Sequence, residues 1–127
     1  MKSAGRISIV LLLATACASA QGKKPVPCAD AQTQAEMNIC WGKEYKAADA
    51  TLNQVYGQLM RKLDESEKTQ LKQVEVAWLK YRDANCEFVA DQYKGGSIRP
   101  MIEAMCLADT SRNRTTELRD QIKNRDQ

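Results

Sequence analysis

The sequence predicts an all-α fold, in which an antiparallel helical hairpin and a third helix form a three-helix, bundle-like domain stapled by two disulfides. Three stretches repeat apolar side chains every three or four residues, which is typical of helices that bury one face. No stretch shows the strict alternation of a half-buried strand. Four cysteines remain once a predicted leader is removed, and an even number in a small exported domain is typical of disulfide bonds.

Residues 1–20 are typical of a secretory signal peptide. Two positive charges precede an apolar run over residues 7–16, and small residues at 18–20 offer a cleavage site. The apolar run is too short to span a membrane. Cleavage after residue 20 is favoured over the alternative, in which Cys17 becomes a lipidated first residue that attaches the protein to a membrane. The leader therefore predicts a periplasmic or secreted protein.

The mature chain, residues 21–127, is predicted to form one domain that begins with an extended arm over residues 21–32. Loss of Lys2 and Arg6 with the leader leaves 17 basic and 16 acidic residues, a net charge of +1. A near-neutral chain of mixed charge gives no basic surface for nucleic acid. We expect a monomer that binds another protein.

Catalysis finds no support in the sequence. The chain has no histidine, which is the usual general base, and no glycine-rich phosphate loop follows a strand. Without histidine or a pair of cysteines two residues apart, a metal site is not expected either. The sequence therefore predicts no enzyme, no catalytic residue and no cofactor.

The first helix is predicted over Thr33–Leu63. Thr33 and Glu36 have the spacing of a capping box, in which each side chain satisfies a backbone donor at the start of a helix. The expected apolar face consists of Met37, Trp41, Tyr45, Ala48, Leu52, Val55, Leu59 and Leu63.

The second helix is expected to begin at a cap provided by Asp64 or Ser66 and to end at Lys94. A heptad-like spacing predicts that its inward face consists of Leu71, Val74, Trp78, Tyr81, Asn85 and Phe88. The third helix is expected to be capped by Ser97 and to hold Pro100 in its first turn. Because residues 109–116 are nearly all polar, we expect its second half to fray.

The disulfide pairing can be predicted from helix geometry. If the last two helices are antiparallel about a turn at residues 95–96, Cys86 and Cys106 lie level with each other, which favours a bond between them and a second between Cys28 and Cys40. The alternative pairs Cys40 with Cys86 and Cys28 with Cys106. It leaves a mismatch of about 6 Å along the helices and ranks second.

The same counting places Asp49 and Arg82 almost level across the first turn. We predict an ion pair between them, with Asn53 close enough to bond Trp78 or the backbone. Asp83 follows Arg82 directly. The favoured interpretation is a buried structural pair that fixes the register of two helices, and the alternative is a polar binding site.

Several motifs occur in the order found in the lysozyme inhibitor LprI family, which the chain resembles. They are Thr33-Gln34-Ala35-Glu36-Met37-Asn38-x-Cys40, Asp49-x-x-Leu52-Asn53-x-x-Tyr56, Trp78-x-x-Tyr81-Arg82-Asp83-x-x-Cys86, Gly95-Gly96-Ser97-Ile98-x-Pro100, Cys106 and Thr110-x-x-x-Arg114-x-x-x-Leu118. The resemblance implies a small exported helical protein, and members include lipoproteins and an inhibitor of c-type lysozyme. It therefore implies a protein partner, with c-type lysozyme as the candidate.

The candidate partner-binding residues are Gly95, Gly96, Ser97 and Arg99. A lysozyme cleft holds two carboxyl groups around the scissile bond. A thin loop could enter such a cleft, because glycines allow close approach of the backbone and serine and arginine donate hydrogen bonds to carboxylates.

Two alternatives remain open at this stage. The Gly-Gly-Ser stretch could simply end one helix and begin the next. The chain could also be a cell-envelope interaction or assembly module that has no relation to lysozyme. That hypothesis predicts an exposed apolar patch, and Trp41 and Tyr45 are the candidates for it.

Overall fold

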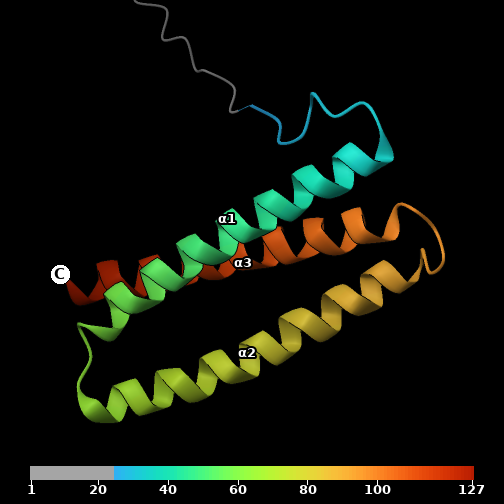
Figure 1. Cartoon of the computed structure of the whole chain (residues 1–127). Coiled ribbons are helices and arrows are strands. Elements are labelled where there is room, and N and C mark those ends of the chain that lie inside the picture. The colour runs from blue at the N-terminus through green and yellow to red at the C-terminus, as the bar shows by residue number, and fades with distance from the viewer. Residues whose placement is uncertain (1–24) are drawn as a thin grey trace, which may run out of the picture.

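The computed structural model describes residues 25–127, which form three helices of 27 residues each: α1 (Gln34–Met60), α2 (Glu65–Asp91) and α3 (Arg99–Arg125). Figure 1 shows α1 and α3 side by side and running in the same direction, with α2 antiparallel to both. The described part of the chain contains no strand. The predicted all-α class is therefore confirmed. The predicted leader, with Cys17, and the start of the arm lie outside the described residues.

The three helices pack unequally. α1 contacts α3 along much of its length, α2 contacts α3 less extensively, and the backbones of α1 and α2 hardly approach each other. In Figure 1, α2 correspondingly stands apart from α1 over most of its length. The first two helices are antiparallel as predicted, but α3 is the helix that joins them into a domain.

Two of the three helices begin with a capping box. At the start of α1 the Glu36 amide donates to the Thr33 hydroxyl over 3.2 Å, and the Thr33 amide donates to the Glu36 carboxylate over 3.0 Å. Asp64 and Glu67 form the equivalent pair at α2, with distances of 2.8 and 3.1 Å. These side chains satisfy backbone donors that no helical carbonyl can reach.

The start of α3 differs from the prediction. Ile98 occupies the N-cap position and makes no side-chain cap, so the expected Ser97 cap is wrong. Pro100 lies in the first turn, where its missing N–H costs nothing. The backbone carbonyl of Ser97 instead accepts a hydrogen bond from the Asn38 side chain over 3.0 Å, which fixes the loop to α1.

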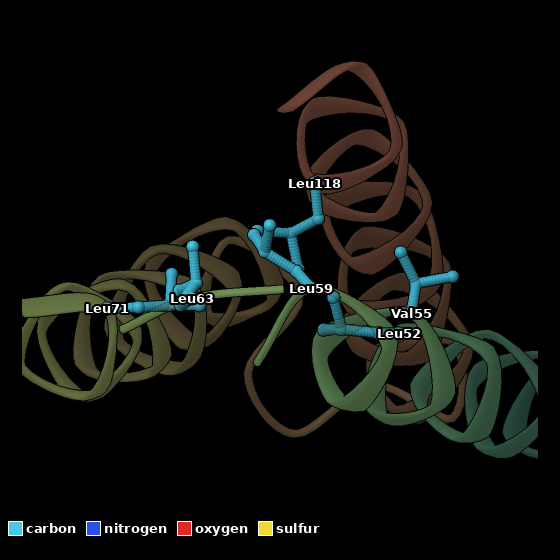
Figure 2. Packing of buried hydrophobic residues seen from close by; sticks show 6 residues of the cluster. All are labelled: Leu52, Val55, Leu59, Leu63, Leu71 and Leu118. Atoms are coloured by element: carbon cyan, nitrogen blue, oxygen red, sulfur yellow. The ribbon is translucent and has the colours of Figure 1, made fainter. Parts of the chain in front are cut away.

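The apolar core lies where the three helices meet near the α1–α2 turn. Figure 2 shows its residues converging from the helices and the turn: Leu52, Val55, Leu59, Leu63, Leu71 and Leu118. Four partly buried side chains pack against them: Tyr56, Met60, Trp78 and Ile122. The apolar face predicted for the first helix from Ala48 onward is thus largely buried.

The inward face predicted for α2 is wrong over half of its residues. Val74, Tyr81 and Phe88 are exposed by 51, 61 and 74%. The residues of α2 that the fold buries are Leu71, Arg82, Cys86 and Ala90. Leu71 and Trp78 have the same seven-residue spacing as Val74 and Tyr81, and the row that faces inward is the one next to Arg82.

The polar middle of α3 does not fray, because it lies between the other two helices. α3 is continuous to Arg125, and Ser111, Arg114 and Thr115 are all buried. The Thr115 hydroxyl donates to the Ser111 carbonyl over 2.9 Å, so this buried hydroxyl has a hydrogen-bond partner within α3 itself. Small hydroxyl residues here allow close packing, while Arg114 reaches across to α2.

Candidate functional site

Two disulfides staple the fold in the pairing that the sequence favoured. Cys28 bonds Cys40 and Cys86 bonds Cys106, with Cα–Cα distances of 5.8 and 5.5 Å. The alternative pairing is therefore excluded. The first bond ties the arm to the start of α1, and the second joins α2 to α3 near the loop between them. Bonds of this kind are typical of proteins that fold in an oxidising, extracytoplasmic compartment.

Residues 92–98 form the loop between α2 and α3, which we call the α2–α3 loop. Gly95 has a φ of 83°, a left-handed backbone conformation that residues with a side chain rarely adopt. A Cβ added at Gly96 would lie 3.2 Å from the Tyr93 carbonyl oxygen, which is closer than most such contacts. Residues 95–97 are exposed, and Figure 1 shows the loop at the end of the molecule where α1 begins. The glycines therefore make a tight turn whose tip is accessible.

Arg99 braces the base of this loop rather than projecting from it. Its guanidinium donates to the Asp91 carboxylate at 2.8 and 3.1 Å and to Glu103 at 2.8 Å. The hydrogen bonds to Asp91 raise the pKa of Arg99; burial opposes this shift, and the charge of Glu103 supports it. The sequence placed Arg99 among the free donors of the loop, whereas the structure has it occupied by two carboxylates.

The side chains available at the tip are those of Ser97 and Lys94. Both residues are exposed, and neither side chain bonds another residue of the described chain. A hydroxyl and an ammonium group can donate to carboxylates or carbonyls of a partner. The tip of the loop thus offers free donors on Lys94 and Ser97.

A second polar cluster lies at the centre of the bundle, where Arg82 joins all three helices. Its guanidinium donates to Asp83 at 2.9 Å, to Asp49 of α1 at 3.0 Å and to the Ser111 hydroxyl of α3 at 3.4 Å. The expected ion pair between Asp49 and Arg82 is thus present. Asn53 donates to Asp49 at 3.3 Å, so the expectation that it bonds Trp78 or the backbone is wrong.

Burial alone would lower the pKa of Arg82. Hydrogen bonds to Asp83 and Asp49, together with the charge of Asp83, outweigh that effect, and the pKa of the guanidinium is raised. Arg82 is therefore a permanent cation inside the fold.

Arg114 is the counterpart of Arg82, and the sequence did not indicate this role. It donates to Glu75 of α2 at 2.9 and 3.1 Å and to Glu117 at 2.9 Å. The guanidinium carbons of Arg82 and Arg114 lie 5.3 and 5.9 Å from the centre of the Trp78 ring, within the range of cation–π attraction. We call Arg82, Arg114 and Trp78 the arginine clamp. The only sign of this role in the sequence was the position of Arg114 in the Thr110-x-x-x-Arg114-x-x-x-Leu118 motif.

The polar groups of the arginine clamp already bond one another and their neighbours. Among residues 25–127, no buried side-chain nitrogen or oxygen lacks a hydrogen-bond partner. A ligand would have to displace existing ion pairs to bind there. The interpretation of Asp49, Asn53, Arg82 and Asp83 as structural residues therefore stays the favoured one.

Several other expectations can be compared with the described residues. Trp41 and Tyr45 are only partly exposed, so the large exposed apolar side chains lie elsewhere, mainly on α2. No cluster of acidic residues and cysteines over residues 25–127 could hold a metal ion. Within the same range, no helix is long and apolar enough to cross a bilayer.

The fold and the loop define a class of protein: a small helical domain, stapled by two disulfides, that presents a rigid loop and a satisfied polar interior. The family model described as "Lysozyme inhibitor LprI" matches residues 28–118, and the chain belongs to this family. It is also 35% identical to "Uncharacterized protein R02472" of Rhizobium meliloti (strain 1021), over 94% of this chain and 95% of that protein. No solved structure matches the chain.

Proposed function

We propose that this protein inhibits a c-type lysozyme in the cell envelope by inserting the α2–α3 loop into the substrate cleft of the enzyme. Membership of the lysozyme inhibitor LprI family carries this proposal. The protein would act by binding, and catalysis would have no part in it. An exported location agrees with the two disulfides.

The α2–α3 loop has the properties that such a cleft requires. A lysozyme holds one protonated and one ionised carboxyl group about the scissile bond. The Ser97 hydroxyl and the Lys94 ammonium can donate to these groups, and the two glycines keep the tip thin enough to enter. These side chains replace Arg99 as the proposed direct donors, while Arg99 holds the loop in shape.

Stiffness of the loop also favours binding, because a loop that is already ordered loses little entropy on association. The bond between Cys86 and Cys106, the contact of Asn38 with Ser97 and the ion pairs of Arg99 all restrain it. Long-range attraction is not expected to contribute much, since the mature chain has a net charge near zero and animal lysozymes are basic. The acidic first turn of α2 lies at the opposite end of the molecule (Figure 1) and does not contribute to this contact.

The test is hydrolysis of peptidoglycan by a c-type lysozyme, titrated with the oxidised mature protein. We expect dose-dependent inhibition, and a loss of about tenfold or more in potency for the Lys94→Ala/Ser97→Ala variant. A matched control is Ser66→Ala/Lys72→Ala, which removes the same two residue types from exposed positions in the half of α2 remote from the loop.

Each outcome has a defined meaning. Equal potency of the two variants would move the binding site away from the loop. No inhibition by the unaltered protein at high micromolar concentration would reject the proposed function for that lysozyme. An Arg99→Ala variant sharpens the result. Arg99 only braces the loop, so its loss should weaken inhibition less than the loss of the two donors does.

A further inference from the structure

One face of α2 is apolar and exposed, because no other part of the described chain covers it. Its residues are Val74, Ala77, Tyr81, Ala84 and Phe88, all exposed, and we call them the α2 stripe. Successive large residues are seven positions apart, with alanines three positions after Val74 and Tyr81. That is the spacing of a coiled-coil seam, in which large and small side chains alternate.

The rest of the described chain does not cover the α2 stripe. The side of α2 that faces α1 carries Val76 and Leu79, which line a groove of about 380 Å³ with Leu52 and Tyr56. The stripe lies on the opposite flank of the helix, where Val74 borders α3. A helix could therefore lie along the stripe without displacing α1.

We propose that the α2 stripe binds the same stripe of a second copy of this protein, in an antiparallel helix pair. With a two-fold axis midway between Tyr81 and Ala84 along each helix, Tyr81 of each copy packs on Ala84 of the other. The same symmetry places Phe88 against Ala77. Tyr81 and Phe88 then each meet an alanine, which allows the two helices to approach closely, while Val74 lies opposite Asp91 at the ends of the contact.

Charge complementarity identifies the second copy as the occupant and fixes its direction. Lys80 and Glu87 flank the stripe on one side, seven positions apart, and both are exposed. Neither forms an ion pair within residues 25–127. An antiparallel pair brings Lys80 of each copy beside Glu87 of the other, twice by symmetry. In a parallel pair the two-fold axis would put these flanks on opposite sides of the seam, so neither lysine would lie beside a glutamate of the other copy.

The size of the interface predicts a weak dimer. One helix face on each side falls below the area of about 1,200 Å² that marks stable complexes. We expect a dissociation constant on the order of 100 µM. This inference departs from the monomer expected from the sequence, and it does not depend on lysozyme inhibition, because the α2–α3 loop is not part of the stripe.

The test is sedimentation equilibrium of the oxidised mature protein from about 10 µM to about 1 mM. We expect the dimer mass at the upper end and a monomer for Phe88→Glu. Lys80→Glu should weaken the dimer about tenfold, because two attractive contacts become repulsive. The double variant Lys80→Glu/Glu87→Lys restores both contacts in the antiparallel pair and should regain the original affinity.

Lys43→Glu changes the same charge at an exposed position on α1 and should leave the dimer unaffected. Lys80 is also exposed, so Lys80→Glu should fold normally, and circular dichroism verifies this for every variant. A protein that stays monomeric to about 1 mM overturns the proposal. So does a dimer that survives Phe88→Glu, or a double variant no tighter than Lys80→Glu alone. Lysozyme inhibition, assayed at dilute protein, reports separately on the loop.

Discussion

α3 is held to α1 and to α2 by different kinds of contact. The contact with α1 is close and mainly apolar, with Leu118 of α3 packed among Leu52, Val55 and Leu59 of α1 (Figure 2). The contact with α2 is less extensive and depends on arginines that reach between helices. Apolar burial thus stabilises one pair, while ion pairs and a disulfide position the other.

This difference assigns separate roles to the two halves of the fold. Apolar burial is worth about 25 cal/mol per Å² and does not require exact geometry. A buried ion pair contributes less net stability, because its attraction must offset the cost of desolvating both charges, but it fixes where the helices lie. α1 and α3 therefore form the stable base, and the arginine clamp determines the position of α2 and the loop that follows it.

The largest effect should come from the apolar contact. Leu59→Ala truncates a side chain that is 0% exposed and should lower the free energy of unfolding by about 3 kcal/mol. Leu79→Ala, on α2 and 37% exposed, is the matched control and should cost about 1 kcal/mol or less. Urea unfolding followed by circular dichroism measures both. Equal losses would mean that α2 is packed as firmly as α1.

A smaller effect should come from the arginine clamp. Arg82→Met removes a side chain that is 7% exposed and bonds Asp49, Asp83 and Ser111. Because both carboxylates remain partly accessible to water, we expect a loss of about 2 kcal/mol rather than the larger cost of isolating a fully buried charge. Hydrogen exchange should show faster opening of α2 than of α1 in this variant.

Arg112→Met is the control for this experiment. Arg112 pairs with Glu44 and so joins α3 to α1, but it is 39% exposed, and such pairs contribute about 0.5 kcal/mol. We expect it to leave exchange in α1 almost unchanged. Comparable losses from the two arginine variants would show that ion pairs support both contacts equally, contrary to the comparison above.

The features that depend on local chemistry could be predicted from the sequence. The capping box of Thr33 and Glu36 marks the start of α1, because side-chain spacing alone decides whether it forms, and Asp64 was one of the two caps predicted for α2. The glycine pair at residues 95–96 marks the turn after α2. The disulfide between Cys86 and Cys106 then follows from counting residues outward from that turn.

Most features that depend on a partner helix could not be predicted, and the Asp49–Arg82 ion pair is the exception, because counting residues across the first turn places the two side chains level. Leu71 and Trp78 share the seven-residue spacing of Val74 and Tyr81, so spacing alone could not tell which row faces inward. The inward row is the one next to Arg82, whose burial requires Asp49 and Ser111 from two other helices. The polar middle of α3 misled for the same reason, since Arg114 is satisfied by Glu75 of α2.

The smallest expected change in stability concerns the cap at the start of α1. Hydrogen bonds from the backbone amides of Gln32 and Thr33 lower the pKa of Glu36. A carboxylate whose pKa is lowered by folding adds stability above its unfolded pKa of about 4.3, and that stability is lost as pH falls through the lower folded pKa. Glu36→Gln should therefore be less stable than the unaltered protein at pH 7, and the difference should shrink in acid.

Carboxyl chemical shifts give the pKa of Glu36 directly, and unfolding measured against pH gives the difference between the two proteins. Glu87→Gln is a suitable control, because Glu87 lies in the interior of α2 and does not cap a helix. It should have the smaller effect at pH 7. A difference for Glu36→Gln that stays constant from neutral to acid pH would show that its ionised carboxylate does not stabilise α1.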